Sequence, residues 1–154
     1  MPQHINSIQG DIYKLNPNEF DAAIVFVKGG FNGLDQVKFD DVKKALGSSS
    51  IGYLIYRDGG GYHPEFLKHK AYLTSFKHEE DALCYIREKV NESLNLVASH
   101  AKRIAFHGIQ IYGLDTDLNT RVTVDAVKEW LSTHEDTTVT FVDLRDSFAK
   151  YITE

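Results

Sequence analysis

The chain has little cysteine, no signal-like N-terminus and no long apolar run. Its 154 residues include one cysteine, Cys84, so no internal disulfide can form, which is compatible with a reducing compartment. The first residues lack the basic-then-apolar order of a signal peptide. No apolar run approaches the ~20 residues of a membrane-spanning helix. These absences predict a soluble, cytoplasmic protein.

Basic charge and metal-binding spacings are also scarce. Lys and Arg number 17 against 22 Asp and Glu, a formal net charge of −5. Because a nucleic-acid reader usually carries a basic face, we expect neither nucleic acid nor an anionic membrane as a partner. None of the 7 histidines pairs at the spacing that places two ligands on one helical face. We therefore expect no metal and no cofactor, and the sequence leaves the oligomeric state open.

The stretch from Arg103 to Gly113 is the most informative part of the chain. It begins as an apolar run, becomes a loop at Gly108 and reaches a second glycine at Gly113. An apolar run bounded by glycines suits a strand buried on both faces of a parallel sheet. In such sheets, ligands bind where the carboxyl ends of strands meet the following loops. We therefore expect this strand in the middle of the core and its loop beside any site.

Strand and helix patterns alternate along the rest of the chain. Intervals of three and four between apolar residues make 79–100 the clearest helix. Short connections and the absence of a linker indicate one α/β domain covering 1–154. The predicted strands are 4–9, 21–27, 51–57, 71–76, the run from 103 and 138–144, and the predicted helices are 34–46, 79–100, 119–130 and a short one from 146.

Several short motifs appear in an order that resembles the macro domain, the family known for binding ADP-ribose and related nucleotide metabolites. They are Ile8-Gln9-Gly10-Asp11-Ile12, Asp21-Ala22-Ala23-Ile24-Val25, Arg103-Ile104-Ala105-Phe106 after a long helix, Ile111-Tyr112-Gly113, and the strand 139–143. The resemblance implies a three-layer α/β/α fold with a mixed, mostly parallel central sheet. It also implies that ADP-ribose or another nucleotide-derived ligand binds in a cleft at the carboxyl ends of the strands.

The resemblance assigns ligand contacts to three segments. Asp11 and Ile12 would hold the base end of the ligand, with Asp11 accepting a hydrogen bond from the adenine amino group, since an ionised carboxylate is an acceptor only. Glycine-rich loops can present backbone N–H groups to phosphates. Such a role falls to Lys28, Gly29 and Gly30, and to Gly108, Ile109, Gln110, Tyr112 and Gly113. Alternatively, Asp11 caps a turn, the glycines only permit tight turns, and Tyr112 is a half-buried loop anchor.

Two histidines are candidates for catalysis. His63 follows three glycines and His107 ends the central strand, and imidazole titrates near neutral pH, as a general base requires. The enzymatic alternative is hydrolysis of ADP-ribosyl esters or of ADP-ribose 1''-phosphate. In a non-catalytic alternative, His63 is an exposed residue of a surface hairpin, and His107 is partly buried and hydrogen-bonded to the backbone. Phe26-Val27-Lys28-Gly29 stands where the family usually has Asn-Ala-Ala-Asn. A third possibility is therefore a degenerate domain serving as a structural or interaction module.

Overall fold

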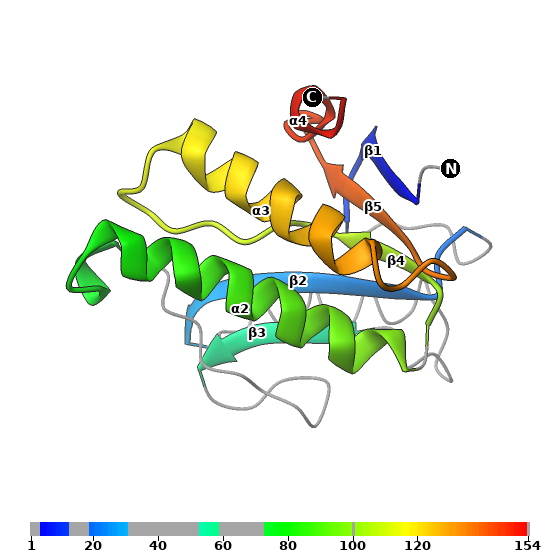
Figure 1. Ribbon diagram of the computed structural model, residues 1–154, viewed down its shortest axis with the longest axis horizontal. Coiled ribbons are helices and arrows are strands. Elements are labelled where there is room, and N and C mark those ends of the chain that lie inside the picture. The colour runs from blue at the N-terminus through cyan, green and yellow to red at the C-terminus, as the bar shows by residue number, and fades with distance from the viewer. Residues whose placement is uncertain (1–3, 13–18, 31–52, 59–72, 100, 154) are drawn as a thin grey trace.

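Five strands form the sheet at the centre of the computed structural model (Figure 1), which describes residues 4–12, 19–30, 53–58, 73–99 and 101–153. Its strand order is β1-β5-β4-β2-β3, and every pairing between these strands is parallel. The expected antiparallel component is therefore absent from the described strands. The strands are β1 (Ile5–Gln9), β2 (Ala22–Gly30), β3 (Tyr53–Asp58), β4 (Arg103–Phe106) and β5 (Thr138–Asp143).

Strand β4 occupies the centre of the sheet, as its apolar sequence predicts. Ile104, Ala105 and Phe106 are all completely buried, which requires cover on both faces of the strand. Strands β5 and β2 flank it, and among the described strands β1 and β3 lie at the two edges of the sheet. The predicted strand 71–76 is wrong where the structure describes it. Leu73–Ser75 is a 3₁₀ turn, and the Leu73 N–H donates to the carbonyl of Tyr112 (2.8 Å) instead of joining the sheet.

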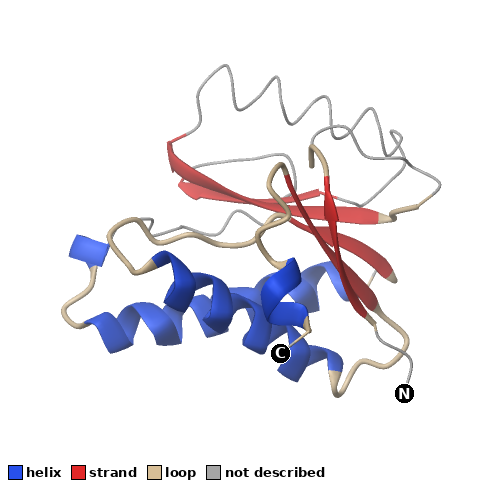
Figure 2. Ribbon diagram, turned by 90° about the horizontal axis from the view of Figure 1, so that it is seen from above, coloured by secondary structure: helices blue, strands red, loops and turns tan. Residues whose placement is uncertain are grey.

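Two long helices, α2 (Glu79–Ala98) and α3 (Thr116–Leu131), cover one face of the sheet side by side (Figure 2). Helix α2 buries residues spaced by three or four positions, so one stripe packs onto the core. The indole N–H of Trp130 on α3 donates to the side-chain carbonyl of Asn95 on α2 (2.8 Å). The described residues thus show two of the three expected layers. The buried stripe of α2 comprises Ala82, Ile86, Val90, Leu94 and Val97.

Helix α3 begins earlier than its sequence predicts. Asp115 is the N-cap residue, and its carboxylate accepts a hydrogen bond from the Leu118 N–H (3.0 Å). Asn119, the predicted first residue, therefore lies inside the helix, with its N–H bonded to the Asp115 carbonyl (2.9 Å) and its side chain bonded outside the helix. The short helix α4 (Ala149–Ile152) packs near this end of α3, where the Tyr151 hydroxyl donates to Asp117.

The order of the strands creates a topological switch point. Along the chain, β2 leads to β3 on one side of the sheet, whereas β4 leads to β5 on the other. The neighbouring strands β2 and β4 therefore send their following segments in opposite directions, which is where open α/β sheets place ligands. The His107 N–H donates to the Ile24 carbonyl (3.1 Å) at this point. None of the described helices is long and apolar enough to span a membrane.

Candidate functional site

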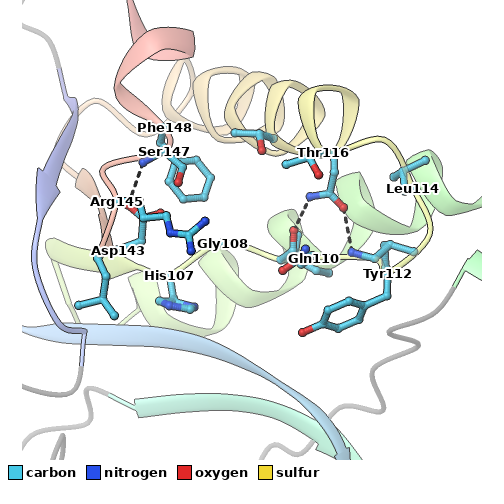
Figure 3. Close-up of a pocket in the computed structure, with 15 residues that line it drawn as sticks. His107, Gly108, Gln110, Tyr112, Leu114, Thr116, Asp143, Arg145, Ser147 and Phe148 are labelled. Carbon is cyan, nitrogen blue, oxygen red and sulfur yellow. Dashed lines mark hydrogen bonds between the residues drawn. The ribbon is translucent and has the colours of Figure 1, made fainter.

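A cavity of about 410 Å³ opens at the carboxyl ends of β4 and β5 (Figure 3). Its size falls within the range of small-molecule sites, roughly 300–1,000 Å³. Three segments form its described wall: the loop after β4, the first turns of α3 and the loop after β5. The lining residues are His107, Gly108, Ile109, Gln110, Ile111, Tyr112, Leu114, Thr116, Asn119, Thr120, Asp143, Leu144, Arg145, Ser147 and Phe148.

The buried side chain of Asn119 fixes the loop after β4. Its amide nitrogen donates to the Ile109 carbonyl (2.7 Å), and its amide oxygen accepts from the Ile111 N–H (2.8 Å). The side chain thereby satisfies both backbone groups that flank Gln110, as a neighbouring strand would. The loop is thus held by a side chain on α3, and Figure 3 shows both bonds.

The same loop leaves three consecutive backbone donors unused. Within the described part of the chain, the N–H groups of Gly108, Ile109 and Gln110 make no hydrogen bond. A trans peptide points its C=O and N–H in opposite directions, so the Gln110 N–H points away from Asn119. Ile109 is 3% exposed, and unpaired backbone N–H groups at buried positions are rare in proteins. Backbone N–H groups without a partner can bind an anionic oxygen where the turn of the chain brings them together.

Gly108 permits the close packing at the base of this loop. Its φ of +94° lies in a region that side chains disfavour. A Cβ built there would lie 2.5 Å from the Phe148 ring. Phe148 is in turn stacked on Phe141 of β5, with ring centroids 4.3 Å apart. The glycine therefore lets the loop after β4 lie directly against the segment after β5.

The loop after β5 contributes Arg145, the one lysine or arginine among the described lining residues. Arg145 makes no hydrogen bond or ion pair within the described residues, and its side chain points into the cavity toward Gly108 (Figure 3). Two features hold this loop: the Asp143 carboxylate accepts from the Ser147 N–H (2.9 Å), and Asp146 adopts a φ of +51°. Aspartate tolerates that left-handed conformation better than most residues. A guanidinium in such a position can pair with a phosphate or a carboxylate.

Five of the residues singled out in the sequence line the cavity, namely His107, Gly108, Ile109, Gln110 and Tyr112. Of these, His107, Gln110 and Tyr112 are exposed, with 41% of Tyr112 accessible.

Gly113 has a different role, because it is not among the lining residues. Its φ is +99°, and a Cβ there would lie 3.2 Å from the Leu73 Cβ. It therefore turns the chain beneath the 3₁₀ segment.

Asp11 and Ile12 lie close to the cavity but outside its described lining. The Gly10 N–H donates to the Asp143 carbonyl (2.8 Å), which places the segment after β1 beside the loop after β5. Asp11 is half-buried, whereas Ile12 is 2% exposed and its side chain belongs to the core. Ile12 can therefore offer only its backbone to a ligand.

Lys28, Gly29 and Gly30 are not in a loop, contrary to the sequence prediction. They form the end of β2, and Gly30 pairs with Asp58 of β3 after a register irregularity that begins at Phe26. Pairing with β3 overrides the turn tendency of the two glycines. His63 lies outside the described residues.

Sequence reasoning missed several residues that shape the cavity. The sequence predicts a helix start at Asn119, and the pairing of its side chain with Ile109 and Ile111 leaves no sequence signal. Arg145 and Phe148 stand in a short polar segment without a recognisable motif. The cavity also brings in Thr116 and Thr120, which share one face of α3.

No protein-family model matches the chain, and no curated protein matches it with significance. Within the described ranges, no three His, Cys, Asp or Glu residues gather as metal ligands would. Fold and cavity together define an α/β protein with a ligand-sized cavity at the carboxyl ends of its parallel strands.

Proposed function

We propose that the protein binds ADP-ribose or a related nucleotide-derived ligand in the cavity at the ends of β4 and β5. The observation that carries this proposal is that the N–H groups of Gly108, Ile109 and Gln110 have no acceptor among the described residues. Asn119 holds the loop in place before any ligand arrives, so little conformational entropy is lost on binding. Phosphate oxygens are the acceptors that such a donor row fits best.

Arg145 supplies the charge that the backbone donors lack. Its guanidinium is directed toward Gly108 and has no partner among the described residues, so it can pair with phosphate without breaking an existing bond. The formal charge of the whole chain is −5, which gives no general attraction to anions. Binding of an anionic ligand would therefore depend on this local cation and on the loop.

The base end of the ligand is assigned to the neighbourhood of Asp11. The bond from Gly10 to Asp143 brings this segment to the rim of the cavity. A carboxylate there selects an exocyclic amine, as adenine offers. The support is the resemblance of Ile8–Ile12 to the opening strand and turn of the macro domain, together with this placement.

Isothermal titration with ADP-ribose tests the proposal. Wild-type protein is expected to bind, and Arg145→Gln is expected to weaken binding by about tenfold or more, since a charge-assisted hydrogen bond contributes roughly 1.5–3 kcal/mol. Arg87→Gln is the matched control, because Arg87 is exposed on α2, outside the cavity lining. Absence of heat with ADP-ribose, together with no thermal shift with other nucleotides, would contradict the proposal and favour a structural or interaction module.

Hydrolysis of an ADP-ribosyl ester or of ADP-ribose 1''-phosphate is the second candidate function. The observation that favours it is the position of His107, exposed at the end of β4 and lining the cavity. An imidazole there can accept a proton from an attacking water, provided that the bond to be broken lies beside it.

A further inference from the structure

Strand β1 lies at one edge of the described sheet, beside α4 (Figure 1). In a parallel ladder alternate residues bond to the neighbouring strand, and the carbonyl of His4 and the N–H of Gly10 both bond to β5 (2.8 Å each). Even-numbered residues therefore bond to β5, and the N–H and C=O groups of Ile5, Ser7 and Gln9 point away from it. No described residue bonds to these outward backbone groups.

This edge lacks the features that usually keep exposed strands from pairing. Natural edges are commonly protected by charged side chains, proline, a bulge or a very short strand. Strand β1 is five residues long, contains neither a charged residue nor proline, and keeps an unbroken register with β5. Asn6 and Gln9 are exposed, and 39% of Ile8 is accessible. By contrast β3, at the other described edge, ends in Arg57 and Asp58.

A second copy of the chain fits this edge by symmetry. Antiparallel pairing about a two-fold axis at Ser7 sets the two Ser7 residues opposite each other and Ile5 opposite Gln9. Residues opposed in this way exchange both of their backbone bonds, so every outward N–H and C=O group of β1 gains a partner. Like charges opposed across two strands destabilise their pairing. None arises here, because β1 is uncharged although the chain carries a formal charge of −5.

A foreign peptide matches this edge less well than a second copy does. Peptides that add a strand to a sheet gain their specificity from pockets that hold alternate side chains. The cavity lining contains no residue of β1, so the cavity does not supply such pockets along this edge. Two-fold homodimers, moreover, are the commonest oligomers of soluble proteins.

We infer that two copies of the chain associate through β1, antiparallel to each other, to form one continuous sheet. All pairings between the described strands are parallel, so the carboxyl ends of the two halves point in opposite directions. The two cavities therefore open at opposite ends of the pair and both stay accessible. Because pairing is confined to one strand edge, the dimer dissociates on dilution. This association goes beyond the proposed function and does not depend on it.

Sedimentation velocity of the full chain, from about 5 to about 500 µM, tests the association, and wild type is expected to pass from monomer to dimer. Ser7→Pro removes an N–H that does not bond to β5, and proline is tolerated at such positions of edge strands. It is expected to weaken dimerisation by about tenfold or more, since both copies lose a central bond. Ser7→Ala keeps the N–H and is the matched control, expected to dimerise as wild type does.

Cysteine cross-linking tests the register while keeping every backbone group. Cys84, which is exposed, is first replaced by serine. Ser7→Cys then places two thiols opposite each other, with Cα atoms about 5.5 Å apart, a separation that a disulfide spans. Gln9→Cys is the matched control, because its two copies lie four residues out of register, roughly 14 Å apart. Mild oxidation is expected to give a covalent dimer of Ser7→Cys but not of Gln9→Cys.

Several results would overturn this inference. Wild type that stays monomeric at every concentration would do so, including a monomer that binds a foreign extended peptide instead. Dimerisation that a folded Ser7→Pro leaves unchanged would place the interface elsewhere. If Ser7→Pro does not fold, cross-linking decides, and equal cross-linking of Ser7→Cys and Gln9→Cys would contradict the pairing. Dimerisation is measured without nucleotide, so failure of ADP-ribose binding would leave this inference standing.

Discussion

The side-chain amide of Asn119 donates to the carbonyl of Ile109 across 2.7 Å, and this bond joins α3 to the loop that follows the central strand. The amide oxygen completes the connection by accepting from Ile111 (2.8 Å). The loop therefore depends on one helical side chain for the order of its donors. A change at Asn119 acts on both the stability of the fold and the proposed site.

Replacing Asn119 with alanine is expected to lower the free energy of unfolding by about 2–3 kcal/mol. The reason is that the Ile109 carbonyl and the Ile111 N–H both lose their partner at a buried position. Urea denaturation followed by circular dichroism measures the loss. Asn91→Ala is the control, since Asn91 is exposed on α2 and its bond to the Arg87 carbonyl (3.0 Å) is local. Equal stability of the two variants would show that the loop does not depend on this amide.

Replacing Gly108 with alanine is expected to destabilise the protein by about 2–4 kcal/mol, combining backbone strain with overpacking. The strain follows from the φ of +94°, and the overpacking from a Cβ placed 2.5 Å from the Phe148 ring. Thermal unfolding measures the sum of the two effects as a lower melting temperature. Gly10→Ala is the matched control, because the nearest described atom to a Cβ there is in the Val142 side chain, at an ordinary contact distance of 3.8 Å.

A double-mutant cycle separates the two causes at Gly108. In a Phe148→Leu background, the flexible leucine yields to the new methyl group, so Gly108→Ala is expected to cost less than in wild type. The part that remains measures the backbone strain. An identical loss in both backgrounds would mean that the ring contact contributes nothing.

An ion pair at the opposite ends of the strands is expected to give acid-sensitive stability. The Arg103 guanidinium bonds to the Asp21 carboxylate (2.7 Å), and this bond, with the backbone N–H groups of Arg103 and Lys102, lowers the pKa of Asp21 below its ordinary value. A carboxyl whose pKa is lower in the folded state stabilises the fold above its unfolded pKa, about 3.9. That contribution is lost as the pH falls through the lower, folded value.

Asp21→Asn is therefore expected to melt at a lower temperature than wild type at pH 7, and the difference is expected to shrink below about pH 4. Both side chains are partly exposed, so the effect is modest and weakens with added salt. Melting curves across pH 2.5–7 at two salt concentrations measure it, with Asp125→Asn on the exposed surface of α3 as control. A difference that persists unchanged at low pH would contradict the ion-pair explanation.

The sequence predicts the parts of the fold that depend on local pattern. The apolar run at Ile104–Phe106 places β4 in the core, and the stripe through Ile86 and Val90 defines α2. Ligands of parallel sheets lie at the carboxyl ends of strands, and this rule predicts that the loop from His107 to Tyr112 lies beside a site. In the structure that loop lines the cavity.

The errors occur where distant partners decide the local structure. Leu73 stands in a segment with the composition of a strand, but its N–H bonds to Tyr112. Gly30 stands in a glycine-rich segment typical of a loop, but it pairs with Asp58 in the sheet. Asn119 resembles a helix cap but bonds to residues eight and ten positions earlier. None of these pairings leaves a periodic or compositional signal, so reading from the sequence alone could not find them. Arg145 was missed for the same reason, since only the fold brings it beside Gly108.

The hydrolase alternative makes a prediction of its own at His107. If the cavity hydrolyses an ADP-ribosyl ester, His107→Gln is expected to lower kcat by about 100-fold or more, because a positioned general base contributes roughly that factor. Glutamine still hydrogen-bonds, so ADP-ribose affinity is expected to stay within about twofold. His134→Gln is the control, since His134 stacks on Trp130 near the far end of α3. A product-release assay measures turnover and calorimetry measures affinity. Turnover that survives His107→Gln would remove this residue as the base, whereas loss of affinity alone would limit His107 to a binding role.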